Sequence, residues 1–454
     1  MLGRGPRPSA LVSPWPVAAI GALVVSGTCA AFATGASAQV AVPEREDNRA
    51  GSSLSAGGEV RQQYEWFANE SWGAEVPDGS GYWLQRYMVY VDARLLRRVR
   101  LYGELKSGIE VGRAGGPRAS DEDRLDLHQG FVALSLGSVT VRAGRQELAF
   151  GSQRLISNRD GPNVRQTFEG ATVVLKRGRW RADGFGTRYV STETGAFDDS
   201  SDTGRSLWGV YAVRWLAQRR TKGLAQYGTK GVDLYYLGYR RSAATFDQGQ
   251  GREVRHSWGA RLWQTSNALE YDVEALVQTG RFASAAIRAW GIGSDIGYQI
   301  ETAPGQPTLG LRADITSGDA DRTDNRLGTF NPLFPRGGYF GLIARAGPSN
   351  QMDLHPIVTL EPRADLLITT GWLFFWRLQT DDGIYTTAGE LLRSAKGTSS
   401  RFVGHSPGVA AEWQVTRKLT LTGNASLFTA GPFVQESGPA RTTGYLAWQV
   451  GYCF

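Results

Sequence analysis

Apolar and polar residues alternate with a period of two along most of this chain. Within residues 82–95, Trp83 and Val89 share one face of an extended strand, and Arg86 and Asp92 share the other. Because successive side chains of a β-strand point to opposite faces, this pattern predicts strands with one apolar and one polar face. The same alternation recurs in three further segments: 99–112, 269–280 and 308–316.

The polar faces carry charges of both signs, for example Asp272 and Glu274 in one segment and Arg312 and Asp314 in another. The core of a packed sandwich would not accept so many charges, because an unpaired buried charge is costly. We therefore expect the polar face to line a wet or salt-bridged interior and the apolar face to contact hydrocarbon. This combination is typical of a transmembrane antiparallel β-barrel.

The last ten residues of the chain show the alternation most clearly. Leu446, Trp448, Val450, Tyr452 and Phe454 lie on one face, and the opposite face is small or polar. Five large apolar side chains at this spacing need either lipid or a partner sheet. We expect them to face lipid, because water inside and hydrocarbon outside explain both faces. The alternative is the last strand of a secreted β-sandwich.

About eighteen such segments can be placed, an even number, as single-chain bacterial barrels require. They lie at residues 57–67, 82–95, 99–112, 125–136, 138–148, 166–176, 180–190, 206–216, 231–241, 253–264, 269–280, 287–300, 308–316, 352–362, 366–377, 404–415, 418–429 and 445–454. Short connections such as 177–179 suit periplasmic turns, and long polar ones such as 318–351 suit extracellular or lumen-folded loops. The sequence therefore predicts an all-β protein, a single transmembrane antiparallel β-barrel.

The first 38 residues differ from the rest. Early arginines precede an apolar stretch at 17–33, and Ala36-Ser37-Ala38 follows. A basic region, an apolar region and a small-x-small site predict a secretory signal peptide at 1–38, cleaved after Ala38. Residues 39–454 then form one barrel domain. Beyond the signal peptide, no run approaches the ~18 to 20 apolar residues of a membrane helix.

The number and type of charged residues limit the classes of partner further. The chain has 50 Lys and Arg against 43 Asp and Glu, a net charge of +7, and lysine occurs at only six positions. Arginine presents a planar donor fork that suits carboxylates and phosphates, although codon bias in a GC-rich genome is an alternative explanation. The basic residues alternate with apolar ones and do not cluster, which argues against DNA or RNA as a partner.

Candidate catalytic and metal-binding groups are sparse. No two of the four histidines have a metal-ligand spacing. His128 shares a strand face with Asp126, but Ser135 falls on the opposite face, so no hydrolase is indicated. Cys453 is the one cysteine beyond the signal peptide, which excludes an intramolecular disulfide. We expect no enzymatic activity, no metal and no cofactor.

Two stretches contain sequence motifs that the alternation of a barrel strand does not explain. The first is GRQELAFGSQRLI at 144–156, continued by NVRQTFEG at 163–170, and the second is FNPLFPRGGYF at 330–340, followed by Asn350. Together they resemble the alginate-export family of outer-membrane proteins, and the similarity extends over about residues 55–454. The resemblance implies an 18-stranded barrel whose lumen is lined by arginines that conduct an anionic polysaccharide.

Carried over by position, the resemblance assigns six charged residues to the substrate pathway: Arg145, Arg154, Arg165, Glu169, Arg336 and Arg345. The arginines would lower the entry barrier for carboxylates, and neighbouring acids such as Glu169 would keep binding weak, as conduction requires. The alternative is that these residues form ion pairs that only stiffen the wall. The penultimate strand, 419–429, departs from the family by offering Thr, Asn and Ser where a pore-facing arginine is expected.

The resemblance also implies function and location. We expect passive transport or export of an anionic, alginate-like polysaccharide or a related acidic solute by a monomer in the lipid of a Gram-negative outer membrane. The closing strand is similar to that of bacterial outer-membrane barrels, so its terminal Phe454 would be recognised by the barrel-assembly machinery. Two other functions fit the same pattern: a general or sugar-acid-specific porin, and a structural or adhesive barrel with a plugged lumen.

Overall fold

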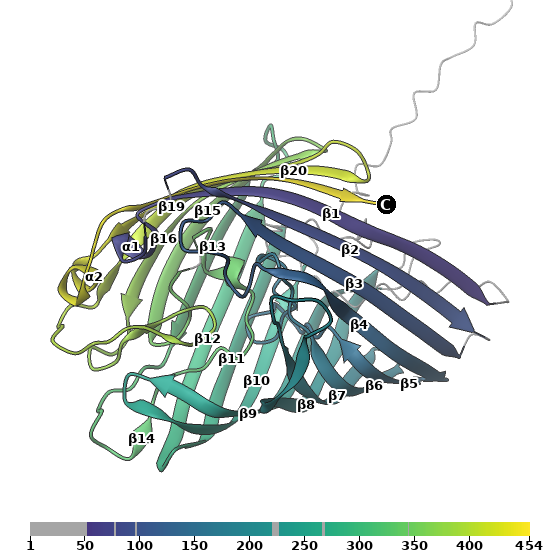
Figure 1. The fold of residues 1–454 in the computed structure, drawn as a ribbon, viewed down its shortest axis with the longest axis horizontal. Coiled ribbons are helices and arrows are strands. Elements are labelled where there is room, and N and C mark those ends of the chain that lie inside the picture. The colour runs from purple at the N-terminus through teal and green to yellow at the C-terminus, as the bar shows by residue number, and fades with distance from the viewer. Residues whose placement is uncertain (1–51, 77–78, 96–97, 220–226, 266–267, 344) are drawn as a thin grey trace, which may run out of the picture.

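The computed structural model describes residues 52–76, 79–95, 98–219, 227–265, 268–343 and 345–454. The predicted signal peptide, residues 1–38, lies outside these ranges. The described residues form a closed antiparallel β-barrel of 18 strands (Figure 1). The prediction of about 18 strands is confirmed, and each predicted segment overlaps one strand of the wall.

The strands of the wall are, in chain order, β1 (Ser53–Ala68), β2 (Tyr82–Leu95), β3 (Val99–Val111), β4 (Asp123–Leu136), β5 (Val139–Gln146), β6 (Phe168–Arg177), β7 (Trp180–Ser191), β8 (Ser200–Arg219), β9 (Tyr227–Phe246), β10 (Gly249–Gln264), β11 (Leu269–Phe282), β12 (Ala285–Gln299), β13 (Thr308–Thr316), β15 (Gln351–Arg363), β16 (Leu366–Arg377), β19 (Phe402–Gln414), β20 (Leu419–Ala430) and β21 (Thr443–Cys453). Each strand pairs with the next one in this order, and β21 returns to β1.

The seam between β1 and β21 closes the ring. The Phe454 N–H donates to the Gly58 carbonyl at 3.1 Å, and the Gly58 N–H donates to the Phe454 carbonyl at 3.2 Å. On the outer surface, the rings of Trp83 and Trp448 pack edge to face with centroids 4.7 Å apart, and Tyr64 stacks on Trp448. Closure leaves no edge strand in the wall, which is the condition for a sheet to cross a bilayer.

Side-chain alternation sorts the two faces of the wall as predicted. Trp448 is 44% exposed and Phe454 50% exposed on the outer face, whereas Tyr445 and Ala447, which point to the opposite face of the same strand, are buried. On β2, the inward Arg86 is only 2% exposed. An outer wall of large apolar side chains needs lipid around it, because no other element of the described chain covers it.

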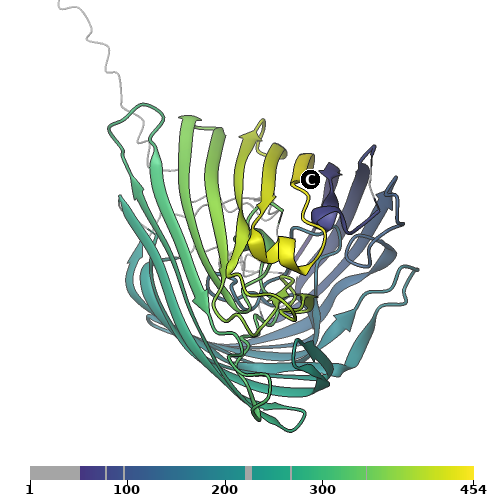
Figure 2. The ribbon, with the colours of Figure 1, turned by 90° about the vertical axis from the view of Figure 1, so that its left-hand side faces the viewer.

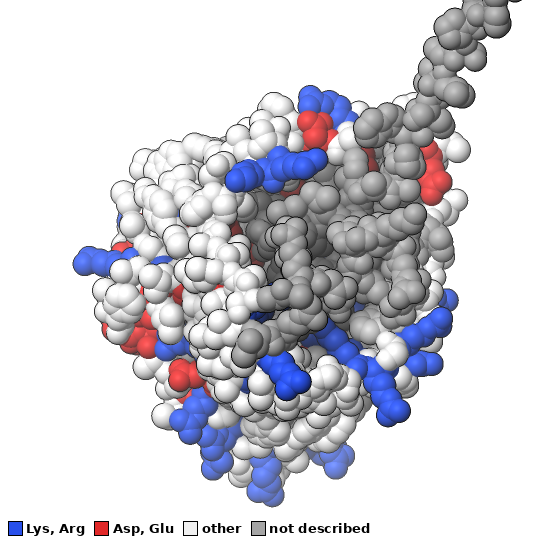
Figure 3. Space-filling view, turned by 90° about the vertical axis from the view of Figure 1, so that its right-hand side faces the viewer, with Lys and Arg blue, Asp and Glu red and all other residues white. Residues whose placement is uncertain are grey.

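The two ends of the barrel differ. The short turns that follow β4 and β6 lie at the end where β1 begins and β21 ends (Figure 1). Bacterial barrels place short turns in the periplasm, so this end is the periplasmic one. Figure 3 views it, and Lys and Arg side chains gather along parts of its rim.

The long connections gather at the opposite, extracellular end, and several of them fold into the bore (Figure 2). Here β8 and β9 extend beyond the predicted 206–216 and 231–241. They do so because strand pairing is held by backbone hydrogen bonds, which continue where the apolar alternation has ended.

Short elements within the connections are α1 (Glu70–Gly73), β14 (Arg326–Leu327), the 3-10 helix η2 (Gly337–Phe340), β17 (Ile384–Tyr385), β18 (Leu391–Arg393) and α2 (Pro432–Ser437). Within the described residues, none of the helices has the length and apolar character needed to cross a bilayer.

Candidate functional site in the lumen

Two connections meet inside the barrel. We name residues 147–167, between β5 and β6, the first lumen segment, and residues 328–343, which follow β14, the second lumen segment. The Phe334 N–H donates to the Leu155 carbonyl at 2.8 Å, and the Ser157 N–H donates to the Phe334 carbonyl at 2.9 Å. The Arg336 N–H donates to the Gln153 carbonyl at 2.9 Å. The two segments therefore form one body, and they contain both of the motifs that carry the family resemblance.

Apolar packing fixes this body to one side of the wall. Leu155, Ile156 and Phe334 belong to a buried cluster that includes Phe168 of β6 and Tyr239 of β9. The Phe334 ring packs edge to face on both Phe168 and Tyr239, with centroids 5.0 and 5.5 Å away. Buried aromatic contacts of this kind hold the segments in place as part of the fold.

A glycine within the first motif permits this close packing. Gly151 has φ +55°, a left-handed conformation that favours glycine. A Cβ atom there would lie 2.3 Å from the hydroxyl oxygen of Tyr211 on the wall. A larger residue at this position would push the segment away from the β8 side of the bore.

The first lumen segment spans the bore. At one end, Arg86 of β2 reaches the Asp160 carboxylate at 2.9 Å. At the other end, Arg154 reaches Asp272 of β11 at 2.8 Å. In a closed ring of 18 strands, β2 and β11 lie on opposite sides. Figure 2 shows these connections inside the barrel.

Asp160 is the centre of an arginine group. Besides Arg86, Arg165 lies 3.5 Å from its carboxylate, and Arg61 of β1 donates to its main-chain carbonyl at 2.9 Å. Burial by itself raises the pKa of the Asp160 carboxyl, but the positive charges of Arg86, Arg165, Arg61 and Arg336 outweigh it and hold that pKa far below the ordinary value. The side chain is 25% exposed, so it stays accessible from the bore.

Arg154 has a different setting. Its guanidinium lies 2.8 Å from Asp272, 3.3 Å from Glu274 and 3.8 Å from Asp314, and its Nε donates to the Tyr339 hydroxyl at 2.8 Å. Three carboxylates thus surround one predicted pathway arginine. This end of the first lumen segment is held by a buried ion-pair network, and the Asp160 end carries the surplus of guanidinium groups.

Arg145 and Glu169 lie apart from this body. They are register partners on β5 and β6, and alternation places both on the outward parity, 3.6 Å apart. The Arg145 guanidinium donates to the main-chain carbonyls of Leu127 and Asp199 at 2.9 and 3.1 Å. Glu169 is 47% exposed and accepts a hydrogen bond from Ser201. Neither residue joins the arginine group at Asp160.

Arg345 lies in a third place. It contacts Ser71 and Glu75 and lies 3.3 Å from Glu70, all in the β1–β2 connection. The six residues predicted from the resemblance therefore divide into three groups. The structure brings together Arg154, Arg165 and Arg336 on the two lumen segments, and it separates Arg145, Glu169 and Arg345 from them.

Sequence reasoning missed the other half of the arginine group. Arg61 and Arg86 project inward from β1 and β2, and the inward parity of Arg86 was visible in the alternation of residues 82–95. No local signal marks Asp160, because two of its partners, Arg61 and Arg86, lie far away along the chain.

The acid–base candidates have structural partners. His128 Nε2 lies 2.8 Å from Glu147 Oε1, a carboxylate that Arg165 also contacts. Within the described residues, Asp123, Asp126 and Asp199 lie close enough to share a metal ion. The Lys106 ammonium lies 2.8 and 2.7 Å from Asp123 and Asp199, so a protein cation already balances this acidic group.

Comparison with known proteins gives a family and a fold. A family model described as alginate export matches residues 52–447. No curated protein matches the chain. Similar solved structures include Pseudomonas aeruginosa OccK8 (OprE), with 13% identity and a TM-score of 0.56, covering 88% of this chain and 98% of that one.

Two other similar structures hold small ligands. Pseudomonas aeruginosa OpdK with vanillate has 11% identity and a TM-score of 0.59, covering 88% of this chain and 98% of that one. Pseudomonas aeruginosa OccK2 (OpdF) in complex with glucuronate has 12% identity and a TM-score of 0.55, covering 89% and 98%. At these identities the likeness establishes a shared barrel fold.

Proposed function

The chain belongs to the alginate export family, and from this premise we propose that it is a passive outer-membrane channel for acidic solutes, above all an anionic polysaccharide. The observation that carries this proposal is the arginine group at Asp160: Arg86 and Arg165 lie 2.9 and 3.5 Å from its carboxylate, Arg61 donates to its main-chain carbonyl, and Arg336 adds positive charge nearby. These four arginines come from β1, β2 and the two lumen segments. A cargo carboxylate has the same chemistry as the Asp160 side chain, so the group that holds one can hold the other.

Internal carboxylates set the strength of binding. Glu59 lies 2.6 Å from Arg86, and Glu147 lies 2.7 Å from Arg165, so these guanidinium groups already have partners. A cargo carboxylate therefore exchanges with a protein carboxylate and does not meet a bare cation. Such an exchange changes the free energy little, which suits a channel because conduction needs binding that is weak and repeated.

A second candidate is a porin for monomeric acids. It is favoured by the shared fold with OpdK and OccK2, whose structures hold vanillate and glucuronate, each with one carboxylate. A monomeric acid needs a single guanidinium binding site, whereas a polymer needs such sites at both ends of the bore. A plugged structural barrel is the third possibility, and it predicts no conductance.

We propose that the signal peptide 1–38 is removed during export, that the barrel-assembly machinery inserts the protein by recognising Phe454, and that the barrel works as a monomer. Closure of β1 on β21 within one chain means that no strand of a second copy is needed to complete the barrel.

Planar-bilayer recording of the Asp160→Asn variant tests the proposal. Removing the internal carboxylate leaves its arginines short of negative charge, so a polyuronate added to one side should block the variant for longer than it blocks the wild type. Asp365→Asn, the same change at an exposed pair with Arg363 in the periplasmic β15–β16 turn, is the matched control.

The outcomes separate the candidates. Longer block by polyuronate in Asp160→Asn alone supports the polymer channel. Block by monomeric uronate with no response to the polymer favours the acid-specific porin. Equal block of both variants contradicts the role of the Asp160 group, and a wild-type barrel that never conducts favours the plugged lumen.

A further inference from the structure

The outer wall carries four arginines that no part of the proposed channel uses. We name them the outward arginine cluster: Arg240 on β9, Arg281 on β11, Arg288 on β12 and Arg326 on β14. Arg240 and Arg281 are both register partners of Val254 on β10. Arg281 and Arg326 are both partners of Ala286 on β12. Three of the arginines thus share one level of the wall, on alternate strands about 10 Å apart.

The members of this cluster are exposed and uncompensated. Arg281, Arg288 and Arg326 are exposed, and the half-buried Arg240 makes only long contacts with the Thr203 carbonyl and the Ser206 hydroxyl, at 3.5 and 3.4 Å. The Arg240 Nε atom is buried without a hydrogen-bond partner. Across the described chain, none of the four pairs with a carboxylate, in contrast to the arginines of the lumen.

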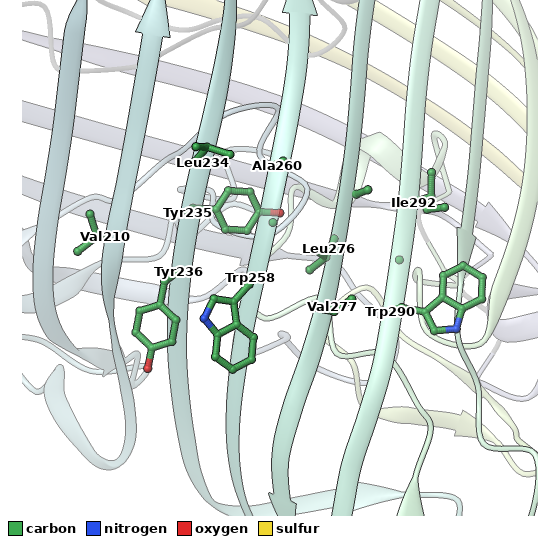
Figure 4. Close-up of a pocket in the computed structure, with 13 residues that line it drawn as sticks. Val210, Leu234, Tyr235, Tyr236, Trp258, Ala260, Leu276, Val277, Trp290 and Ile292 are labelled. Atoms are coloured by element: carbon green, nitrogen blue, oxygen red, sulfur yellow. The ribbon is translucent and has the colours of Figure 1, made fainter.

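An apolar groove lies next to this cluster on the same outward face. Successive register partners form an aromatic row of Tyr236, Trp258, Val277 and Trp290, and the next row is Leu234, Ala260, Ala275 and Ile292 (Figure 4). The small side chains of Ala260 and Ala275 leave a hollow between their larger neighbours. The resulting groove has a volume of about 780 Å³ and a mostly apolar lining.

The aromatic row and the strand length fix the depth of these features in the membrane. The Tyr236 hydroxyl forms a hydrogen bond with His256 Nδ1 at 2.8 Å, and Trp208 Nε1 donates to the same hydroxyl at 3.3 Å. The polar atoms of these rings therefore meet at one level of the wall. Amphipathic rings gather at the headgroup level of a bilayer. On β10, residues 254–264 match the ~9 to 11 residues of a membrane-spanning strand. The cluster therefore lies at the outer leaflet's headgroups, with the groove in the hydrocarbon below.

We propose that this face binds one phosphorylated glycolipid of the outer leaflet, with phosphates on the outward arginine cluster and acyl chains in the groove. The planar guanidinium group of arginine matches the geometry of a phosphate group. Phosphate also supplies the negative charge that no carboxylate of the described chain provides to this cluster. A neutral or zwitterionic lipid would leave the cluster uncompensated. A second copy of the chain, packed by two-fold symmetry, would bring two arginine clusters together and is disfavoured by their repulsion.

Lipid binding by the purified full-length barrel tests this proposal, with lipopolysaccharide as the probe. Its binding in detergent can be followed by native mass spectrometry. The double variant Arg281→Ala/Arg288→Ala should bind about thirtyfold more weakly, the loss expected for two arginine–phosphate attractions at a membrane surface. Ala260→Phe, which fills the groove, should weaken binding without changing its dependence on salt.

Arg124→Ala is the matched control, because Arg124 is an exposed arginine near the extracellular end of β4, away from the groove. It should bind as the wild type does. Equal binding by the wild type and the double variant would overturn the proposal, as would equal binding of dephosphorylated lipopolysaccharide. A lipid-free dimer that dissociates on the Ala260→Phe change would also overturn it, in favour of a second copy. If the double variant fails to fold, Arg281→Lys/Arg288→Lys keeps the charge and should retain part of the affinity.

Discussion

At the scale of single residues, the lumen arginines serve as partners of buried carboxylates. Arg261 shows this most clearly, since it is almost fully buried and lies 2.7 Å from Asp233 and 2.6 Å from Asp272. Without it, Asp233 would lose the one ion-pair partner that it has among the described residues, and Asp272 would keep only Arg154. An arginine in this setting contributes to folding through the charges that it neutralises.

Arg261→Ala should therefore lower the free energy of unfolding by about 3 to 5 kcal/mol, the cost of breaking a buried ion pair. Urea titration of the barrel in detergent, followed by tryptophan fluorescence, measures this change. Arg363→Ala, at an exposed pair with Asp365, is the control and should leave the unfolding midpoint unchanged. An Arg261→Ala midpoint equal to that of the wild type would show that water reaches Asp233 and Asp272.

At the residue scale, the sequence predicted which face of the wall a side chain points to. It did not predict which residues contact one another. The period of two placed Arg86 and Arg312 on the inner face, where the structure has them. It gave no information on the contacts of Asp160 with Arg61 and Arg86, which lie on strands distant in the chain. Assignment by resemblance placed Arg145 and Glu169 in the pathway, although strand parity points both outward.

At the scale of elements, the first lumen segment determines how the bore is divided. It is attached to β2 through Asp160 and to β11 through Arg154, so it crosses the interior. Replacing residues 150–164 by a short Gly-Ser linker should raise the single-channel conductance several-fold. The barrel should still fold, because the backbone hydrogen bonds of the wall close without this segment.

Shortening the β12–β13 connection at residues 301–306, at the periplasmic end, provides the control and should leave conductance unchanged. Single-channel recording of both variants and the wild type measures the conductances to be compared. Equal conductance of the linker variant and the wild type would mean that another element sets the narrowest point.

The strands could be predicted because apolar and polar residues alternate within each strand, which shows locally which side chains share a face. The lumen segments were not, because their fold depends on contacts such as that between Leu155 and Phe334, which are remote in the chain. Their motifs indicated that these stretches are special, but only the structure shows that they join into one body.

At the scale of the whole molecule, the last residue takes part in closing the ring. Phe454 exchanges two backbone hydrogen bonds with Gly58 and adds an exposed ring to the lipid face. Deleting Phe454 should reduce the fraction of folded barrel in the outer membrane, read from the heat-dependent shift of its gel mobility. Phe454→Tyr should keep both hydrogen bonds and an aromatic end, and should assemble normally. Normal assembly of the deletion variant would show that closure tolerates the loss of this rung.

The central claim is that guanidinium groups around Asp160 select for anions, and the reversal potential of the channel under a salt gradient tests it most directly. The wild type should be anion-selective, and Arg165→Ala/Arg336→Ala should shift the reversal potential toward cations, because each change removes positive charge from a low-dielectric bore. Arg363→Ala, on the periplasmic rim, should not shift it. An unchanged reversal potential in the double variant, with a folded and conducting barrel, would contradict the account.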